Sequence, residues 1–131
     1  FGNQFIMDED DNVIGEESDL LINATTLSLE DAYELVLAHG GACYPAHIDR
    51  DSNSVTAVLG GLPPNSGFKF AELHDKAKAS KFQSTNCEFI VSSDAHNLWS
   101  IKEKTDYVEL PESNDADSVR RWLIEYLRCK K

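Results

Sequence analysis

The sequence predicts an α/β domain in which helices and strands are layered against one another. Two segments carry apolar residues at helical spacing, which is typical of helices with one face on a core. Short apolar runs of strand length alternate with them, and several of these runs end in polar clusters. With 131 residues, of which 41% are hydrophobic, the chain is long enough for one domain with one core.

The N-terminal elements follow from local signals. Residues 5–7 and 12–15 flank Asp8-Glu9-Asp10-Asp11, which predicts a hairpin with a solvated acidic turn. The acidic run lacks the mid-loop glycine and closing glutamate of an EF-hand. Residues 20–23 fit a short strand or an extended segment. Ser28 then caps a helix that ends at Gly40-Gly41, and its core-facing stripe is Leu29, Ala32, Tyr33, Val36 and Leu37.

The remaining elements are expected in the order in which they occur. A buried strand at 42–46 ends near Pro45, which has no amide hydrogen for a ladder. The sequence then predicts a short helix at 54–59, a loop at 63–67, a strand at 68–73, a weak exposed helix or turn at 76–82, a strand at 88–92, a loop or single helical turn at 99–104, and a strand at 107–110. A final helix capped by Asn114 carries the stripe Val119, Trp122, Leu123, Tyr126 and Leu127, with basic residues near its end.

Composition excludes several classes of partner. The net charge of -11 repels a nucleic-acid backbone, although it allows a small phosphorylated substrate held through a metal. No apolar run approaches the ~20 residues that span a bilayer. The three cysteines, Cys43, Cys87 and Cys129, form no CxxC pair, which indicates a reducing, cytoplasmic compartment without a disulfide framework.

Two polar clusters at strand ends carry the chemistry. Residues 45–50 read Pro-Ala-His-Ile-Asp-Arg, and residues 92–96 read Ser-Ser-Asp-Ala-His. His47, Asp94 and His96 are candidate ligands for zinc, manganese or iron. Positions i and i+2 of a strand share one side, so Asp94 and His96 are expected to face one cavity. Taken alone, each cluster is more typical of a hydrogen-bonded histidine or a turn; together they favour a shared site.

These two clusters resemble the third and fourth motifs of the PHP (polymerase and histidinol phosphatase) family, and the similarity extends over nearly the whole chain. The resemblance implies a distorted, usually seven-stranded βα barrel and a phosphoesterase with up to three metal ions. His47, Asp94 and His96 would be metal ligands. Arg50 would bind the substrate phosphate, with a structural salt bridge as the alternative. His74 matches no ligand of the family and is left unassigned.

The chain departs from the family in one respect: it contains no His-x-His motif. The expectation is therefore that residues 1–131 are the C-terminal part of a single PHP-like domain, incomplete without its N-terminal half and inactive alone. An incomplete barrel would leave a sheet edge unpaired, where self-association is expected. The alternatives to the enzyme are a non-catalytic binding or regulatory module, and a structural α/β domain whose histidines only form hydrogen bonds.

Overall fold

The computed structural model describes residues 2–64, 66–103 and 105–128. Within them the elements follow in the order β1 (Gln4–Met7), β2 (Val13–Glu17), α1 (Leu29–Ala38), α2 (Val55–Leu59), β3 (Phe70–Leu73), the 3₁₀ helix η1 (Lys76–Thr85), β4 (Glu88–Val91), the 3₁₀ helix η2 (Leu98–Ser100) and α3 (Ala116–Arg128). Two sheets of two strands each are present, one antiparallel and one parallel.

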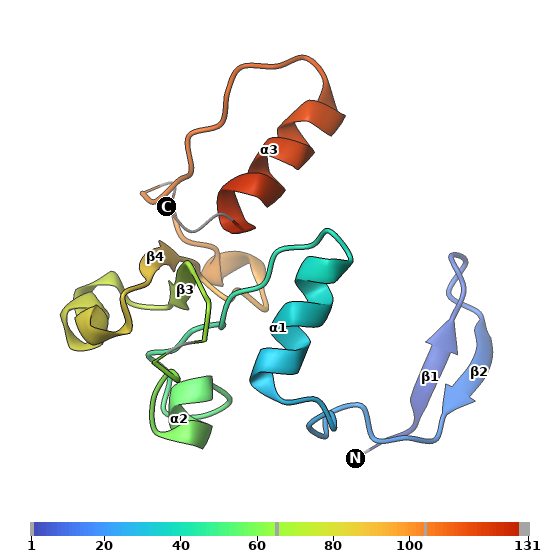
Figure 1. The fold of residues 1–131 in the computed structure, drawn as a ribbon. Helices are drawn as coiled ribbons and strands as arrows, with labels where there is room; N and C mark the ends of the chain where they lie inside the picture. Colours follow the sequence, from blue (N-terminus) through green and yellow to red (C-terminus); the bar gives the residue numbers. More distant parts are fainter. Residues whose placement is uncertain (1, 65, 104, 129–131) are drawn as a thin grey trace.

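The expected portion of a seven-stranded barrel is wrong. β1 and β2 pair only with each other, as an antiparallel hairpin that stands to one side of the other elements (Figure 1). β3 and β4 form a separate parallel pair, and no barrel is present in the part of the chain described here. Two of the expected strands are not strands in the structure, and a barrel cannot close without them.

The expected strand at 42–46 is an extended segment that borders β3. The Glu72 N–H donates to the Pro45 carbonyl at 2.9 Å, and the Ile48 N–H donates to the Glu72 carbonyl at 2.9 Å. This is the bonding of a parallel pair with one extra residue, so the segment bulges beside β3. Because Pro45 has no N–H, the ladder does not extend into a regular strand.

The expected strand at 107–110 is also wrong. The described structure has irregular backbone there, although the apolar alternation is typical of a strand. Tyr107 is 69% exposed and Leu110 is 40% exposed, so the alternation buries little apolar surface. Residues 20–23, for which a strand or extended segment was expected, form a turn in which the Asn23 N–H donates to the Leu20 carbonyl.

Helices and hairpin are confirmed where local signals define them. The Ser28 side chain accepts from the Asp31 N–H at 3.0 Å and begins α1, and Gly40 ends it with a φ of 79°. At α3 the cap differs by one residue, because Asp115 rather than Asn114 accepts the Ser118 N–H. Cys129, Lys130 and Lys131, which were expected near the end of this helix, lie outside the described residues, as does Asn65 of the expected loop.

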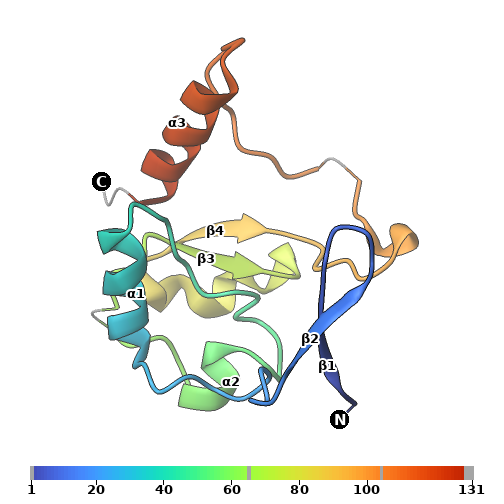
Figure 2. The same cartoon turned by 90° about the vertical axis from the view of Figure 1, so that its right-hand side faces the viewer.

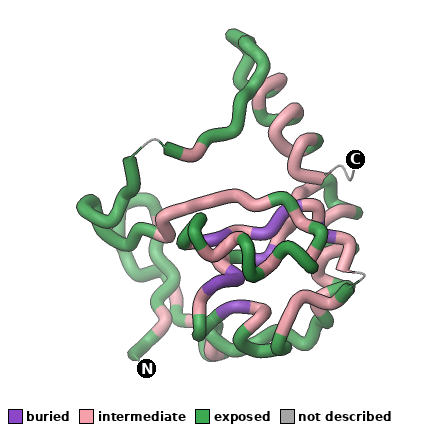
Figure 3. Tube along the Cα trace, turned by 90° about the vertical axis from the view of Figure 1, so that its left-hand side faces the viewer, coloured by how far each residue is buried: buried purple, intermediate pink, exposed green. Residues whose placement is uncertain are grey.

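The core is small and lies around β3. Its buried members are Ile48, Ala71 and Leu73, and half-buried apolar residues from α2, η1 and β4 pack against them. Figure 3 shows the buried positions gathered around this strand. A second apolar group joins β3 to α1 and α3: the Tyr33 and Phe68 rings meet edge to face at 5.0 Å, and Phe70 lies 5.1 Å from Tyr126. None of the described helices has the length and apolar character required to cross a membrane.

Candidate functional site

Three neighbouring segments end at one edge of the parallel sheet. β3 and β4 run side by side in the same direction (Figure 2), and the segment at 45–48 borders β3 on its other side. Their carboxyl ends therefore lie at a common edge, here called the carboxyl edge, where sites of α/β proteins collect. His47 lies within the segment at 45–48, His74 directly follows β3, and Asp94 lies shortly after β4.

Arg50 and Asp94 join two of these segments. Arg50 Nη1 lies 3.2 Å from Asp94 Oδ2, with the two side chains 40% and 27% exposed. On the other oxygen, His96 Nε2 lies 3.5 Å from Asp94 Oδ1. The structure therefore brings Asp94 and His96 together in the loop after β4, where the His96 side chain is 83% exposed, and Asp94 joins this loop to the one that contains Arg50.

His47 lies with a different acid. Its Nδ1 is 3.6 Å from Glu72 Oε1, and both side chains are more than four-fifths buried. Glu72 belongs to β3, opposite the bulge in the neighbouring segment. A carboxylate on one imidazole nitrogen orients the ring and leaves Nε2 for another ligand. Sequence reasoning missed Glu72, although a carboxylate within the apolar run 68–73 is itself an unusual feature.

Two of the three expected ligands adopt left-handed backbone. φ is 28° at His47 and 47° at Asp94. Among the described residues, the other non-glycine positions with positive φ are Asp11, Asn53 and Asn86, and Asn, Asp and His are the types that adopt this region most often. His47 has the smallest of these angles, and it forms the bulge beside β3. Strained backbone and bulges concentrate at functional sites, so this conformation favours a functional role for the edge.

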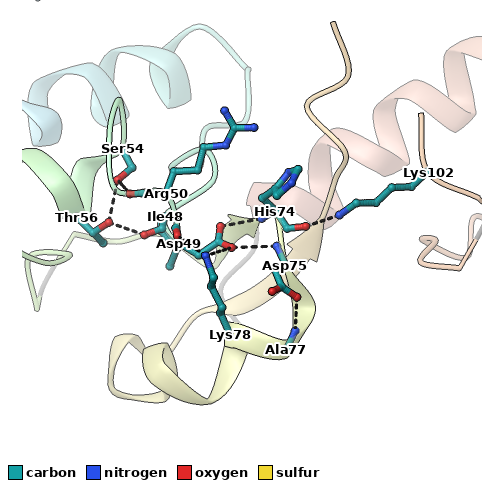
Figure 4. A network of polar contacts seen from close by, with 10 residues as sticks. All are labelled: Ile48, Asp49, Arg50, Ser54, Thr56, His74, Asp75, Ala77, Lys78 and Lys102. Atoms are coloured by element: carbon teal, nitrogen blue, oxygen red, sulfur yellow. Dashed lines mark hydrogen bonds and ion pairs between the residues drawn. The ribbon is translucent and has the colours of Figure 1, made fainter. Parts of the chain in front are cut away.

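Asp49 is structural. Its side chain is buried, and its two oxygens accept the N–H groups of His74 at 2.8 Å and Asp75 at 2.9 Å (Figure 4). Burial on its own would raise the pKa of Asp49, but these hydrogen bonds and nearby Lys78 outweigh it, so the pKa lies below its ordinary value. The residue therefore fastens the loop of residues 47–50 to the start of η1.

His74 lies at the same edge and was left unassigned from the sequence. Its backbone is held on both sides, because its N–H donates to Asp49 and its carbonyl accepts from Lys102 Nζ (Figure 4). Its Nδ1 is buried and has no hydrogen-bond partner within the described structure. Buried polar atoms are nearly always paired, so this nitrogen is a feature that a site can use. No signal in the sequence distinguished His74 from an ordinary strand-end histidine.

The donors suit a divalent cation in kind but not in number. Imidazole nitrogen and carboxylate oxygen are the ligands that zinc, manganese and iron accept. However, residues 2–64, 66–103 and 105–128 contain no group of three or more His, Cys, Asp or Glu arranged to hold a metal ion. His47 pairs with Glu72, and His96 pairs with Asp94, so the structure shows two donor pairs rather than one complete centre.

In comparisons with protein-family models, curated proteins and solved structures, nothing matches this chain.

Proposed function

We propose that the carboxyl edge takes part in metal-dependent hydrolysis of a small phosphorylated substrate. One observation carries the proposal: Asp94, His96 and Arg50, from two segments distant in the sequence, form one cluster at the end of parallel strands. A cation bound there would lower the pKa of a coordinated water and neutralise phosphate charge. The two motifs that resemble the PHP family also support the proposal, although the barrel that the resemblance implies is absent from the described residues.

The residues of the cluster have separate roles in this proposal. The Asp94–His96 pair supplies one oxygen and one nitrogen donor, and His47, oriented by Glu72, offers a nitrogen in a separate donor pair. The Arg50 guanidinium presents five N–H donors, so it can keep its contact with Asp94 while it donates to a phosphate. Manganese, zinc and iron all suit these donors. Two protein donors hold a cation weakly, so affinity is expected to rise when phosphate adds oxygen ligands.

Calorimetric titration of the chain with manganese or zinc, with and without inorganic phosphate, tests the proposal. Asp94→Asn and His96→Gln should each weaken cation binding about tenfold or more. His39→Gln is the matched control, because His39 caps α1 away from the edge and its Nδ1 lies 2.8 Å from the Leu35 carbonyl. Equal affinities in all four proteins would rule out the metal role.

Turnover is measured in the same proteins with a chromogenic phosphomonoester. Cation-dependent release of phosphate that is lost in Asp94→Asn and retained in His39→Gln supports hydrolysis. Cation binding without turnover would support the second candidate, a non-catalytic binding or regulatory module. The specific observation in its favour is that the described residues contain no group of three metal donors.

The proposal also covers the cellular compartment and the self-association of the chain. A reducing, cytoplasmic compartment is proposed from the sequence, because its three cysteines are widely spaced and form no CxxC pair. Among the residues that the structure describes, β4 has a strand partner on one side only, so its other edge supports the proposed self-association. Light scattering of the chain tests the proposed self-association, and a monomeric mass across a concentration series would reject it.

A further inference from the structure

A cavity of about 330 Å³ lies between α2 and η1, beside the loop of residues 47–50. Ile48, which is 1% exposed, and half-buried Phe82 give it apolar surface, and Thr56 and Ala57 of α2 form another wall. Its size is at the lower end of the range of small-molecule sites. The cavity borders the carboxyl edge, because Arg50 belongs to both.

Cationic side chains are concentrated at this cavity. Arg50, Lys78 and Lys81 line it, which is three of the twelve Lys and Arg residues in a chain of net charge -11. Lys78 and Lys81 lie on successive turns of η1, since a 3₁₀ helix places i and i+3 on one side. In a protein that repels anions overall, a local surplus of this kind marks a place where an anion can bind.

Carboxylates offset part of this surplus. Asp49 accepts two backbone N–H groups, and Lys78 Nζ lies 3.9 Å from its Oδ2 and donates to its carbonyl at 3.1 Å (Figure 4). Arg50 pairs with Asp94. Asp51 is exposed and lies at the rim. Within the described part of the chain Lys81 has no ion pair, so its ammonium group is free to meet a ligand.

We propose that this cavity binds the phosphate group of a small phosphorylated organic molecule. Lys81 and Lys78 contact the phosphate from η1, and the organic part lies on Phe82 and Ile48. The inference goes beyond the proposed function, because it needs no metal ion and depends on Lys81, which is no part of the carboxyl edge.

The test is a titration of the full chain with inorganic phosphate and with a hexose phosphate, followed by amide NMR in the presence of a chelator. Perturbed amides are expected at 48–51, 56–57 and 78–82, with the hexose phosphate binding more tightly than phosphate. Lys81→Gln should weaken binding about fivefold. Lys76→Gln is the control: Lys76 is also on η1, but it pairs with Asp106 and does not line the cavity.

Three outcomes would overturn the inference: no binding in the millimolar range, unchanged affinity in Lys81→Gln, or perturbations confined to residues 92–96. A His96→Gln variant separates the inference from the proposed function, because His96 pairs with Asp94 and does not line the cavity. It should bind phosphate as wild type does in chelator, whether or not the carboxyl edge holds a cation. Because Lys81 is exposed, its substitution should leave the unfolding midpoint unchanged, and a thermal melt checks this.

Discussion

The guanidinium of Arg50 lies 3.2 Å from the carboxylate of Asp94, and this ion pair ties the loop before α2 to the residues after β4. Both side chains are partly exposed, so water and salt screen the attraction. In a double-mutant cycle of Arg50→Ala and Asp94→Ala, we expect a coupling of about 0.2–1 kcal/mol in the free energy of unfolding. Denaturant melts at low and high salt measure it, and a coupling that is insensitive to salt would contradict the screened pair.

Asp49 is expected to contribute much more to stability. Asp49→Ala removes the acceptor of two backbone N–H groups, those of His74 and Asp75, at a buried position. A hydrogen bond to a charged group contributes about 1.5–3 kcal/mol, so we expect a loss of about 3 kcal/mol or more in the free energy of unfolding. Asp51→Ala, at an exposed neighbour, should change it by less than about 0.5 kcal/mol. Similar denaturation midpoints for both variants would contradict the structural role of Asp49.

The same carboxylate gives the protein a defined response to acid. The folded-state pKa of Asp49 lies below the ordinary value of 3.8. Its contribution is therefore fully present above pH 3.8 and is lost as pH falls through the folded-state pKa. We expect the stability difference between wild type and Asp49→Asn to be constant near neutral pH and to shrink below this value. Urea melts across this pH range measure it; a difference that grows in acid would have the wrong sign.

The left-handed backbone of His47 predicts that this position favours glycine over alanine. A non-glycine residue in such a conformation costs about 1–3 kcal/mol, more than the 0.5–1 kcal/mol of chain entropy that glycine adds. His47→Gly and His47→Ala both remove the largely buried imidazole and its contact with Glu72, so we expect the glycine variant to have the higher free energy of unfolding of the two. Ala46→Gly is the control, because Ala46 does not have positive φ and its replacement by glycine should only destabilise. Thermal melts in which His47→Gly is no more stable than His47→Ala would argue against strain at His47.

The sequence predicts elements well where their signals are local. The Ser28 cap, the apolar stripe and Gly40 together define α1, and the acidic turn defines the hairpin. Strands depend on partners, and the residues that supply a partner are distant in the sequence. The alternation at 107–110 is that of a strand, yet the described structure has no strand there because no neighbour bonds to it. The expected barrel came from the resemblance to the PHP family, and the two strand pairs of the described residues do not form one.

In the candidate site, too, contacts between residues near in the sequence differ in predictability from contacts between distant residues. Asp94 and His96 lie 3.5 Å apart, but β4 ends at Val91 and Asp94 has a φ of 47°, so the contact forms in a loop and not through the strand period on which the prediction was based. The pairing of His47 with Glu72 depends on where the bulge at 45–48 meets β3, and no periodicity encodes that register. Within the described residues His74 Nδ1 is buried without a hydrogen-bond partner, and the backbone of His74 is held by Asp49 and Lys102, which are distant in the sequence.

Gly67 offers a sharp test of the packing between α1 and the loop before β3. Its φ is 79°, and a Cβ at this position would lie 2.9 Å from Tyr33 Cε1. The ring cannot easily move away, because the Tyr33 hydroxyl donates to the Gly67 carbonyl at 3.0 Å and the ring packs on Phe68. Gly67→Ala should therefore cost about 2 kcal/mol or more in the free energy of unfolding, through both strain and overpacking.

Gly61 provides the matched control for this substitution. No atom lies within 4 Å of a Cβ built there, and its φ is not positive. Gly61→Ala should therefore be neutral, or stabilise by about 0.4–1 kcal/mol by restricting the unfolded chain. Denaturant melts of the two variants distinguish a specific contact from a general intolerance of loops. If Gly67→Ala were as stable as Gly61→Ala, the Tyr33 ring would not lie against Gly67, and the attachment of α1 to β3 would have to depend on other residues.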